Sequence, residues 1–110
     1  MLMAIAVQDI IADARKSFDT FQKTGDARSF ERGISGLYAF YRVYPLVSKY
    51  ENNNYIILHE MIAFLATDKN YDLARNKYTD RLIEALGDLE EDYNSAPGLT
   101  KLKYLTMDLD

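Results

Sequence analysis

Apolar residues recur at intervals of three and four in four segments of this 110-residue chain, and short polar breaks separate the segments. A spacing near 3.6 places side chains on one face of a helix. The segments predict helices over about residues 4–23, 27–50, 54–66 and 72–94, within a single domain, 1–110. The expected fold class is therefore all-α: an antiparallel up-down four-helix bundle with a short C-terminal tail, 95–110, packed on it.

The breaks between the predicted helices carry recognisable end signals. Gly25 is suited to stop the first helix, and Asp26 to cap the second. Pro45 lacks an amide proton and must kink or end the second helix. Gly33 and Gly36 lie on or beside the apolar face of that helix and weaken its helix propensity. We expect both glycines to allow close approach of a neighbouring helix.

The stretch GISGLYAFYRVYPLVSKY is rich in tyrosine, which raises the question of a stacking platform. Its apolar residues fall within one arc of a helical wheel, with only Tyr38 and Val43 on the flanks, so the ladder is interpreted as a core face. A GxxG clamp for single-stranded nucleic acid would need basic flanks and neighbouring strands, which the sequence lacks. The predicted core of the whole bundle comprises Phe18, Phe30, Leu37, Tyr41, Leu58, Ile62, Leu82 and Leu89.

The third helix carries more apolar surface than three neighbouring helices need. Ile56, Ile57 and Phe64 form a second face that the tail or a partner must cover. The tail offers Leu99, Leu102, Leu105 and Leu109, whose spacing fits a helix, although its last residues also fit a strand. We expect the tail to turn back at Pro97-Gly98 and lie along the bundle. Lys101, Lys103 and Tyr104 would then point outward.

Composition narrows the compartment and the partners. The chain has no cysteine, which fits a reducing cytosol. Its formal net charge of −4 weighs against a nucleic-acid partner. The start, MLMAIAVQDII, lacks the basic region of a signal peptide. The longest apolar segment, YIILHEMIAFLA, is too short and too polar for a transmembrane span.

Reactive groups do not assemble into a known catalytic or metal motif. His59-Glu60 begins like the zinc-binding HExxH helix, but residue 63 is alanine and the chain has no second histidine. Asp68, Asn70 and Asp72 imitate a calcium loop without its glycine and its final glutamate. No di-iron carboxylate pattern, phosphate loop or nucleophilic triad appears. We therefore expect no cofactor, no metal and no enzymatic activity.

The apolar third helix, NYIILHEMIAFLA, passes through the polar turn TDKNYD into an amphipathic fourth, YTDRLIEALGDLEEDYN. Over about residues 8–109 this pattern resembles the immunity proteins of pediocin-like (class IIa) bacteriocins, the enterocin A immunity family. The resemblance implies a cytoplasmic protein that confers antimicrobial peptide resistance on a bacteriocin producer. It would act at the inner face of the membrane by binding the mannose-phosphotransferase permease that holds the bacteriocin.

In that family the C-terminal half and tail are linked to which bacteriocin is recognised. The resemblance thus implies partner-binding residues on the fourth helix and the tail: Lys77, Arg81, Lys101, Lys103, Tyr104 and Leu105.

Two other function classes remain open. The first is a small acidic regulatory domain, of antitoxin or adaptor type, that binds a basic protein through the fourth helix, where Asp80, Glu84 and Asp88 follow one another at four-residue spacing. The second is a bundle enzyme or ligand carrier that uses the core tyrosines.

Overall fold

The computed structural model describes residues 2–47, 52–67, 70–92 and 96–105, and in these ranges it is all-α, without a strand. The expected fold class is therefore confirmed at the all-α level. The elements are α1 (Leu2–Thr24), α2 (Ala27–Val47), α3 (Asn52–Thr67), α4 (Tyr71–Leu73), the π-helical segment η1 (Ala74–Tyr78), α5 (Thr79–Glu91) and α6 (Ala96–Lys103). The start of α2 is the expected one, and the last residues of that expected helix, 48–50, lie outside the described residues. The other helix ends lie within three residues of those expected, because periodicity alone does not fix the terminal residue of a helix.

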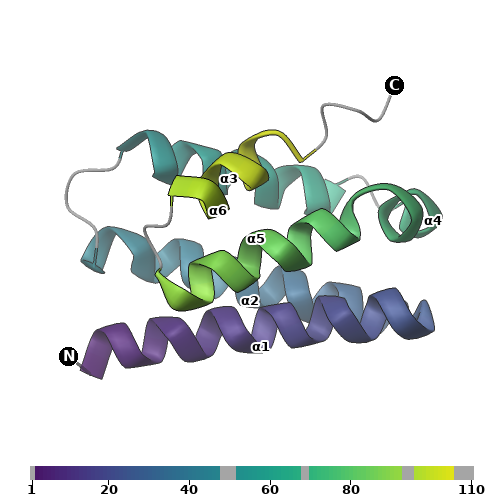
Figure 1. Cartoon of the computed structure of the whole chain (residues 1–110), viewed down its shortest axis with the longest axis horizontal. Helices are drawn as coiled ribbons and strands as arrows, with labels where there is room; N and C mark the ends of the chain where they lie inside the picture. Colours follow the sequence, from purple (N-terminus) through teal and green to yellow (C-terminus); the bar gives the residue numbers. More distant parts are fainter. Residues whose placement is uncertain (1, 48–51, 68–69, 93–95, 106–110) are drawn as a thin grey trace.

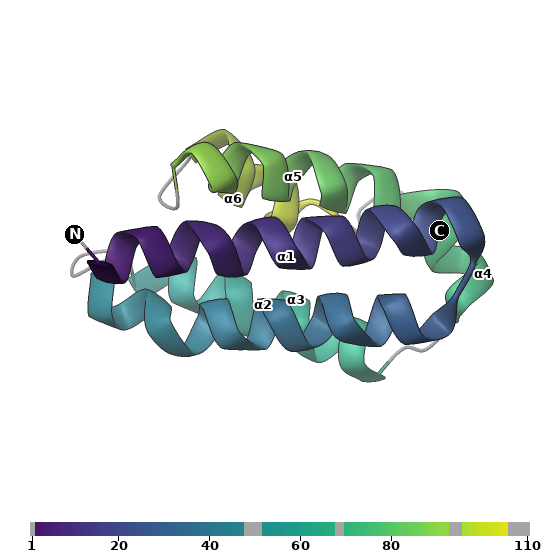
Figure 2. The same cartoon turned by 90° about the horizontal axis from the view of Figure 1, so that it is seen from below.

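The long helices and α6 are arranged in a ring in the order α1, α2, α3, α6 and α5. α2 and α5 both run antiparallel to α1 on either side of it (Figures 1 and 2). α3 packs on α2, and α6 lies between α3 and α5 and contacts both. The predicted tail is thus a helix that takes a place in the ring. Pro97 and Gly98 lie in its first turn and do not form the expected reversal, since proline is compatible with a first helical turn that needs no amide donor.

The turn between α1 and α2 has the predicted end contacts. Gly25 has a φ of +74°, and its amide donates to the carbonyl of Phe21 at 2.7 Å. The Asp26 carboxylate accepts from the Arg28 amide at 3.0 Å, which caps α2. A two-residue connection of this kind forces the two helices to lie side by side and antiparallel.

Arg75, in η1, caps the C-terminal end of α1. Its Nε and Nη2 donate to the carbonyls of Gln22 and Lys23, each at 3.0 Å. A guanidinium at a helix C-terminus satisfies orphan carbonyls and complements the helix dipole. A Cβ at Gly25 would lie 2.7 Å from Nη1 of Arg75, so this cap needs glycine there for space as well as for φ.

The core contains the apolar faces of all the long helices. Seven of the eight predicted core residues are buried: Phe18, Phe30, Leu37, Leu58, Ile62, Leu82 and Leu89. The prediction for Tyr41 is wrong, because its side chain packs against the core but is only partly buried. It lies at the edge of α2, beside a surface hollow described below.

The close approach predicted for the two glycines of α2 is confirmed. A Cβ at Gly33 would lie 2.6 Å from ring carbons of Phe18, and one at Gly36 would lie 2.8 Å from the Cβ of Ala14. The backbone of α2 therefore packs directly on α1 side chains at these two positions.

The predicted fourth helix is interrupted by η1. The Asn70 side chain accepts from the Leu73 amide at 3.1 Å and starts the helix. Thr79 lies five positions after Ala74, which is the spacing of a π-helical turn. Its amide and its hydroxyl both donate to the carbonyl of Ala74, the hydroxyl at 2.7 Å. This wider turn allows the consecutive residues Tyr78 and Thr79 both to be buried.

Core truncation tests the arrangement. Leu58→Ala or Leu82→Ala should each lower the free energy of unfolding by about 2–5 kcal/mol, because each leaves a cavity in the buried core. Chemical denaturation followed by circular dichroism measures the loss. Ile56→Ala is the control, expected to change stability by less than about 0.5 kcal/mol because that side chain is 52% exposed. Losses under about 1 kcal/mol at both leucines would contradict the packing.

Two helical glycines should respond to alanine with opposite signs. Gly33→Ala should destabilise the protein by about 1–3 kcal/mol, because the new methyl group overlaps the buried ring of Phe18. Gly87→Ala meets nothing within 4 Å and should stabilise α5 by up to about 1 kcal/mol through helix propensity. Thermal unfolding measures both changes, and a Gly33→Ala protein that is not destabilised would refute close α1–α2 contact.

The Arg75 cap should be measurable as well. Arg75→Met keeps the apolar stem but removes both hydrogen bonds to α1, and should cost about 1–2 kcal/mol of unfolding free energy. Arg32→Gln, at an exposed position on α2, is the control and should be nearly neutral. An Arg75→Met protein as stable as this control would show that the cap is energetically silent.

Candidate functional site

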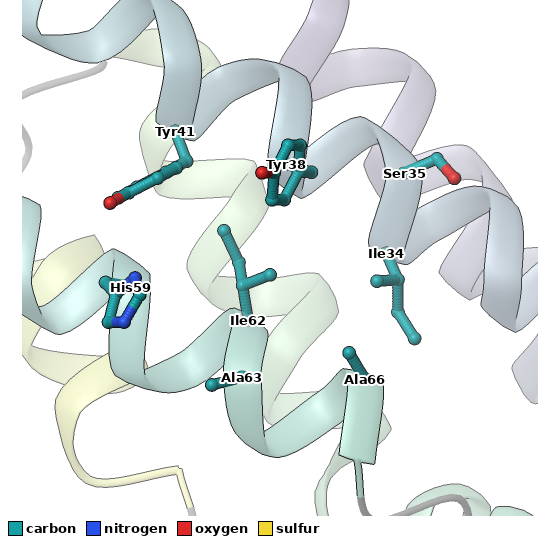
Figure 3. A pocket seen from close by; sticks show the side chains of 8 residues that line it. All are labelled: Ile34, Ser35, Tyr38, Tyr41, His59, Ile62, Ala63 and Ala66. Atoms are coloured by element: carbon teal, nitrogen blue, oxygen red, sulfur yellow. The ribbon is translucent and has the colours of Figure 1, made fainter.

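A pocket of about 430 Å³ opens between α2 and α3 (Figure 3). Its wall on α2 consists of Ile34, Ser35, Tyr38 and Tyr41, and its wall on α3 consists of His59, Ile62, Ala63 and Ala66. The lining is mostly apolar and contains no carboxylate. Pockets that bind small ligands have volumes of about 300–1,000 Å³ and linings of this kind.

The antiparallel course of α2 and α3 sets the layout of the pocket. Tyr41 and His59 face each other at one end with ring centroids 5.6 Å apart, and Ile34 and Ala66 lie at the other end. Tyr38 lies between these ends, with its centroid 6.1 Å from that of Tyr41. Alanines at 63 and 66 leave the space open, because a larger side chain on α3 would fill it.

One basic side chain on α2, that of Arg42, lies beside the pocket. Arg42 lies one turn beyond Tyr38, with its Cζ 6.0 Å from the ring centroid. Arg28 and Arg32 are exposed on the outer side of the same helix. Glu31, the acidic residue of α2, accepts a hydrogen bond from the Tyr71 hydroxyl at 2.7 Å, and this bond raises the pKa of Tyr71. α2 therefore presents positive charge in a chain whose net charge is negative.

The tail presents a second candidate surface, the Lys103–Tyr104 surface, defined by these two exposed residues at the end of α6. The Nζ of Lys103 lies 5.5 Å from the centroid of the Tyr104 ring, which is 46% exposed. Both side chains point outward as expected. The ammonium and the ring together offer a cation, a hydroxyl and an apolar face to a partner.

Two other predicted tail residues are placed differently. Lys101 was expected to point outward, but its Nζ pairs with Asp88 at 2.7 Å and Glu84 at 3.0 Å. These hydrogen bonds raise the pKa of Lys101, so the ammonium remains charged and paired throughout the neutral range and loses its charge only in strongly alkaline solution. Leu105 is fully buried and offers no surface to a partner. Both residues hold the tail in place.

Lys77 and Arg81 lie on neighbouring elements, in η1 and in the first turn of α5, and both are exposed. They are four residues apart, and η1 ends between them. They lie on different elements from Lys103 and Tyr104 and are not part of the Lys103–Tyr104 surface.

The second face of α3 is covered in part by α6. Phe64 is partly buried, with its ring 5.7 Å from that of Tyr78, and Ile57 packs against the core. A smaller hollow of about 130 Å³ remains beside them, lined by Ile57, Glu60, Met61, Phe64 and Lys103. Ile56 stays 52% exposed. α6 contacts α3, as expected for a tail packed on the bundle, but the second face of α3 stays partly exposed.

The weak metal motifs have other roles where the structure describes them. His59 contacts Tyr41, and Asn70 caps α4; Asp68 lies outside the described residues. In the described ranges no three histidine, cysteine or carboxylate side chains are grouped so as to hold a metal ion.

The α2–α3 pocket was not anticipated from the sequence, where Tyr41 was assigned to the core. One signal could have indicated it: Ala63 and Ala66 interrupt a helix whose other residues on that side are large.

No helix in the described part of the chain combines the length and the apolar character needed to cross a bilayer. Comparisons with protein-family models, with curated proteins and with solved structures found no match to this chain.

Proposed function

We propose that this protein acts by binding alone, as an immunity protein that protects a bacterium from a pediocin-like pore-forming peptide. Its partner would be the mannose-phosphotransferase permease with bound bacteriocin, contacted at the cytosolic face. The sequence resemblance to the enterocin A immunity family motivates this proposal. The finer description of the fold, an antiparallel up-down four-helix bundle with α6 as its packed tail, is part of the same proposal.

The observation that supports it is the Lys103–Tyr104 surface. Tyrosine beside a cation is a common anchor in protein interfaces, because it buries a large ring while keeping a polar end. The surface is also rigidly supported, since α6 buries Leu99 and Leu102, and the turn after it buries Leu105. A preorganised surface loses little conformational entropy on binding.

Close packing between α6 and α5 strengthens this support. A Cβ at Gly98 would lie 3.0 Å from Cγ of Leu89 and 3.1 Å from the carbonyl oxygen of Ala85. Lys101 adds two ion pairs to α5. The tail surface is therefore presented by a helix with fixed position.

The alternative, an acidic regulatory domain of antitoxin or adaptor type that binds a basic protein, receives less support from the structure. It depends on the row Asp80, Glu84 and Asp88 along α5. Two of these carboxylates pair with Lys101, which neutralises part of the acidic face from within the molecule.

The structure also changes how the tail can be tested. Deleting α6 and the turn after it would expose the surfaces covered by three buried leucines, and burial of each is worth about 1.5–3 kcal/mol. Such a truncation should unfold the protein rather than leave a folded core. Surface substitutions on α6 separate binding from stability more cleanly.

The protection assay uses a bacteriocin-sensitive strain that expresses the full chain. The wild-type protein should raise resistance to one or a few pediocin-like peptides and leave others effective. The double variant Lys103→Glu with Tyr104→Ser should reduce that resistance at least tenfold, because it removes the cation and the ring at exposed positions. The inhibitory concentration of each peptide is measured, with Lys16→Glu on α1 as the charge-matched control.

Two results would overturn different parts of the proposal. Absence of protection against a broad panel, despite confirmed folded expression, would refute the immunity role. Protection by the double variant equal to that by the wild type would refute the tail surface as the contact.

A further inference from the structure

We infer that the α2–α3 pocket is a binding site for a small aromatic ligand that carries an anionic group. This inference is independent of the proposed immunity role, which rests on a different part of the molecule, the Lys103–Tyr104 surface. It rests on the lining, the guanidinium beside it and the shape of the hollow.

The lining favours a flat ring. Tyr38, Tyr41 and His59 present three aromatic side chains along the opening, and Ile62 with Ala63 and Ala66 forms an aliphatic wall opposite α2 (Figure 3). Aromatic rings attract one another at centroid distances of about 4.5–7 Å in offset or edge-to-face arrangements. The spacing of 5.6 Å between Tyr41 and His59 shows that rings in this wall already pack in this way.

The charge beside the pocket favours an anion. Arg42 lies over the Tyr38 ring and has no carboxylate partner among the residues that the structure describes. None of the eight lining residues is acidic. Glu60, on the same helix as His59, lines the other hollow with Lys103. Thus an acidic group entering beside Tyr38 meets an available guanidinium and no carboxylate of the lining.

A second copy of the chain fits this pocket less well. A stable protein interface buries about 1,200–2,000 Å², whereas this hollow spans only two turns of each helix. A symmetric dimer would also bring the same face of two copies together. Arg42, which borders the pocket on each copy, would then bring two guanidinium groups to one interface whose lining has no carboxylate to pair with them. A small anionic ligand avoids this repulsion.

Two probes that differ mainly in charge test the inference. 8-Anilinonaphthalene-1-sulfonate has an aromatic system and a sulfonate, and N-phenyl-1-naphthylamine has the same rings without the charge. Fluorescence titration measures affinity and stoichiometry on untagged full-length protein. The chain has one histidine, so the imidazole protons of His59 give one set of resonances that reports the pocket directly.

We expect one sulfonate probe to bind per chain and to shift the His59 resonances. Ala63→Leu should weaken binding at least tenfold by filling the pocket, while Ala96→Leu, an exposed position on α6, should leave it within twofold. Arg42→Gln should weaken the sulfonate probe about twofold to fivefold, as for an exposed ion pair, and leave the neutral probe unchanged. Arg32→Gln is the matched arginine control.

Each other outcome counts against the inference. If probe fluorescence rises while the His59 resonances stay unchanged, or if Ala63→Leu has no effect, the pocket is not the site. If the neutral probe binds as tightly and Arg42→Gln changes nothing, the anionic component is wrong. A dimer in sedimentation that Ala63→Leu disperses would assign the pocket to self-association instead.

Folding of the variants is checked by circular dichroism. If Ala63→Leu disturbs the fold, Tyr38→Ala replaces it, because that side chain is 51% exposed and its removal should spare the core. It should weaken the sulfonate probe at least fivefold. Unchanged binding in a folded Tyr38→Ala protein would overturn the inference as well.

Discussion

The apolar surface of α3, which exceeds what its neighbours along the chain can bury, is the constraint on which the rest of the structure depends. α2 packs on one side of α3. The other side requires α6, so a segment that could have been an idle tail becomes part of the core. Because burial of apolar area drives folding, the leucines of the tail are held by the same force as the long helices. The parts of α3 that remain uncovered line the α2–α3 pocket and the smaller hollow beside α6.

Polar contacts join α1 to α5 along its length and to η1 at its C-terminal end. Near its start, the Gln8 amide donates to the Glu90 carbonyl, and Arg15 pairs with the Glu90 carboxylate at 2.6 Å, which raises the pKa of Arg15. At its end, Arg75 caps its carbonyls from η1. The π turn sets the path of the chain here, because it buries Tyr78 and Thr79 together while Arg75 reaches α1. These polar contacts fix how α1 lies along the helix that hydrophobic packing places beside it.

The two candidate surfaces differ in what they could recognise. The Lys103–Tyr104 surface lies at a helix end and offers a cation beside an exposed ring, which suits a protein partner. The α2–α3 pocket is concave, aromatic and bordered by an arginine, which suits a small ligand. Their supports are also different: α6 rests on α5 through Gly98 and Lys101, whereas the pocket depends on α2 and α3. Substitutions at one surface should therefore leave the other intact.

Periodicity alone determined the all-α class, the positions of the long helices and most of the core, because a 3.6-residue repeat places side chains on one face before any tertiary contact exists. Local chemistry also determined the Gly25–Asp26 turn, since left-handed φ and side-chain capping are properties of a few adjacent residues. The place of the tail, the pairing of Lys101 and the burial of Leu105 were decided by tertiary structure, because they depend on the surface that α3 and α5 leave open. Tertiary structure also decided the pocket. Whether Tyr41 is buried depends on the size of the residues that face α2 from α3, and helical spacing within α2 carries no information about those residues.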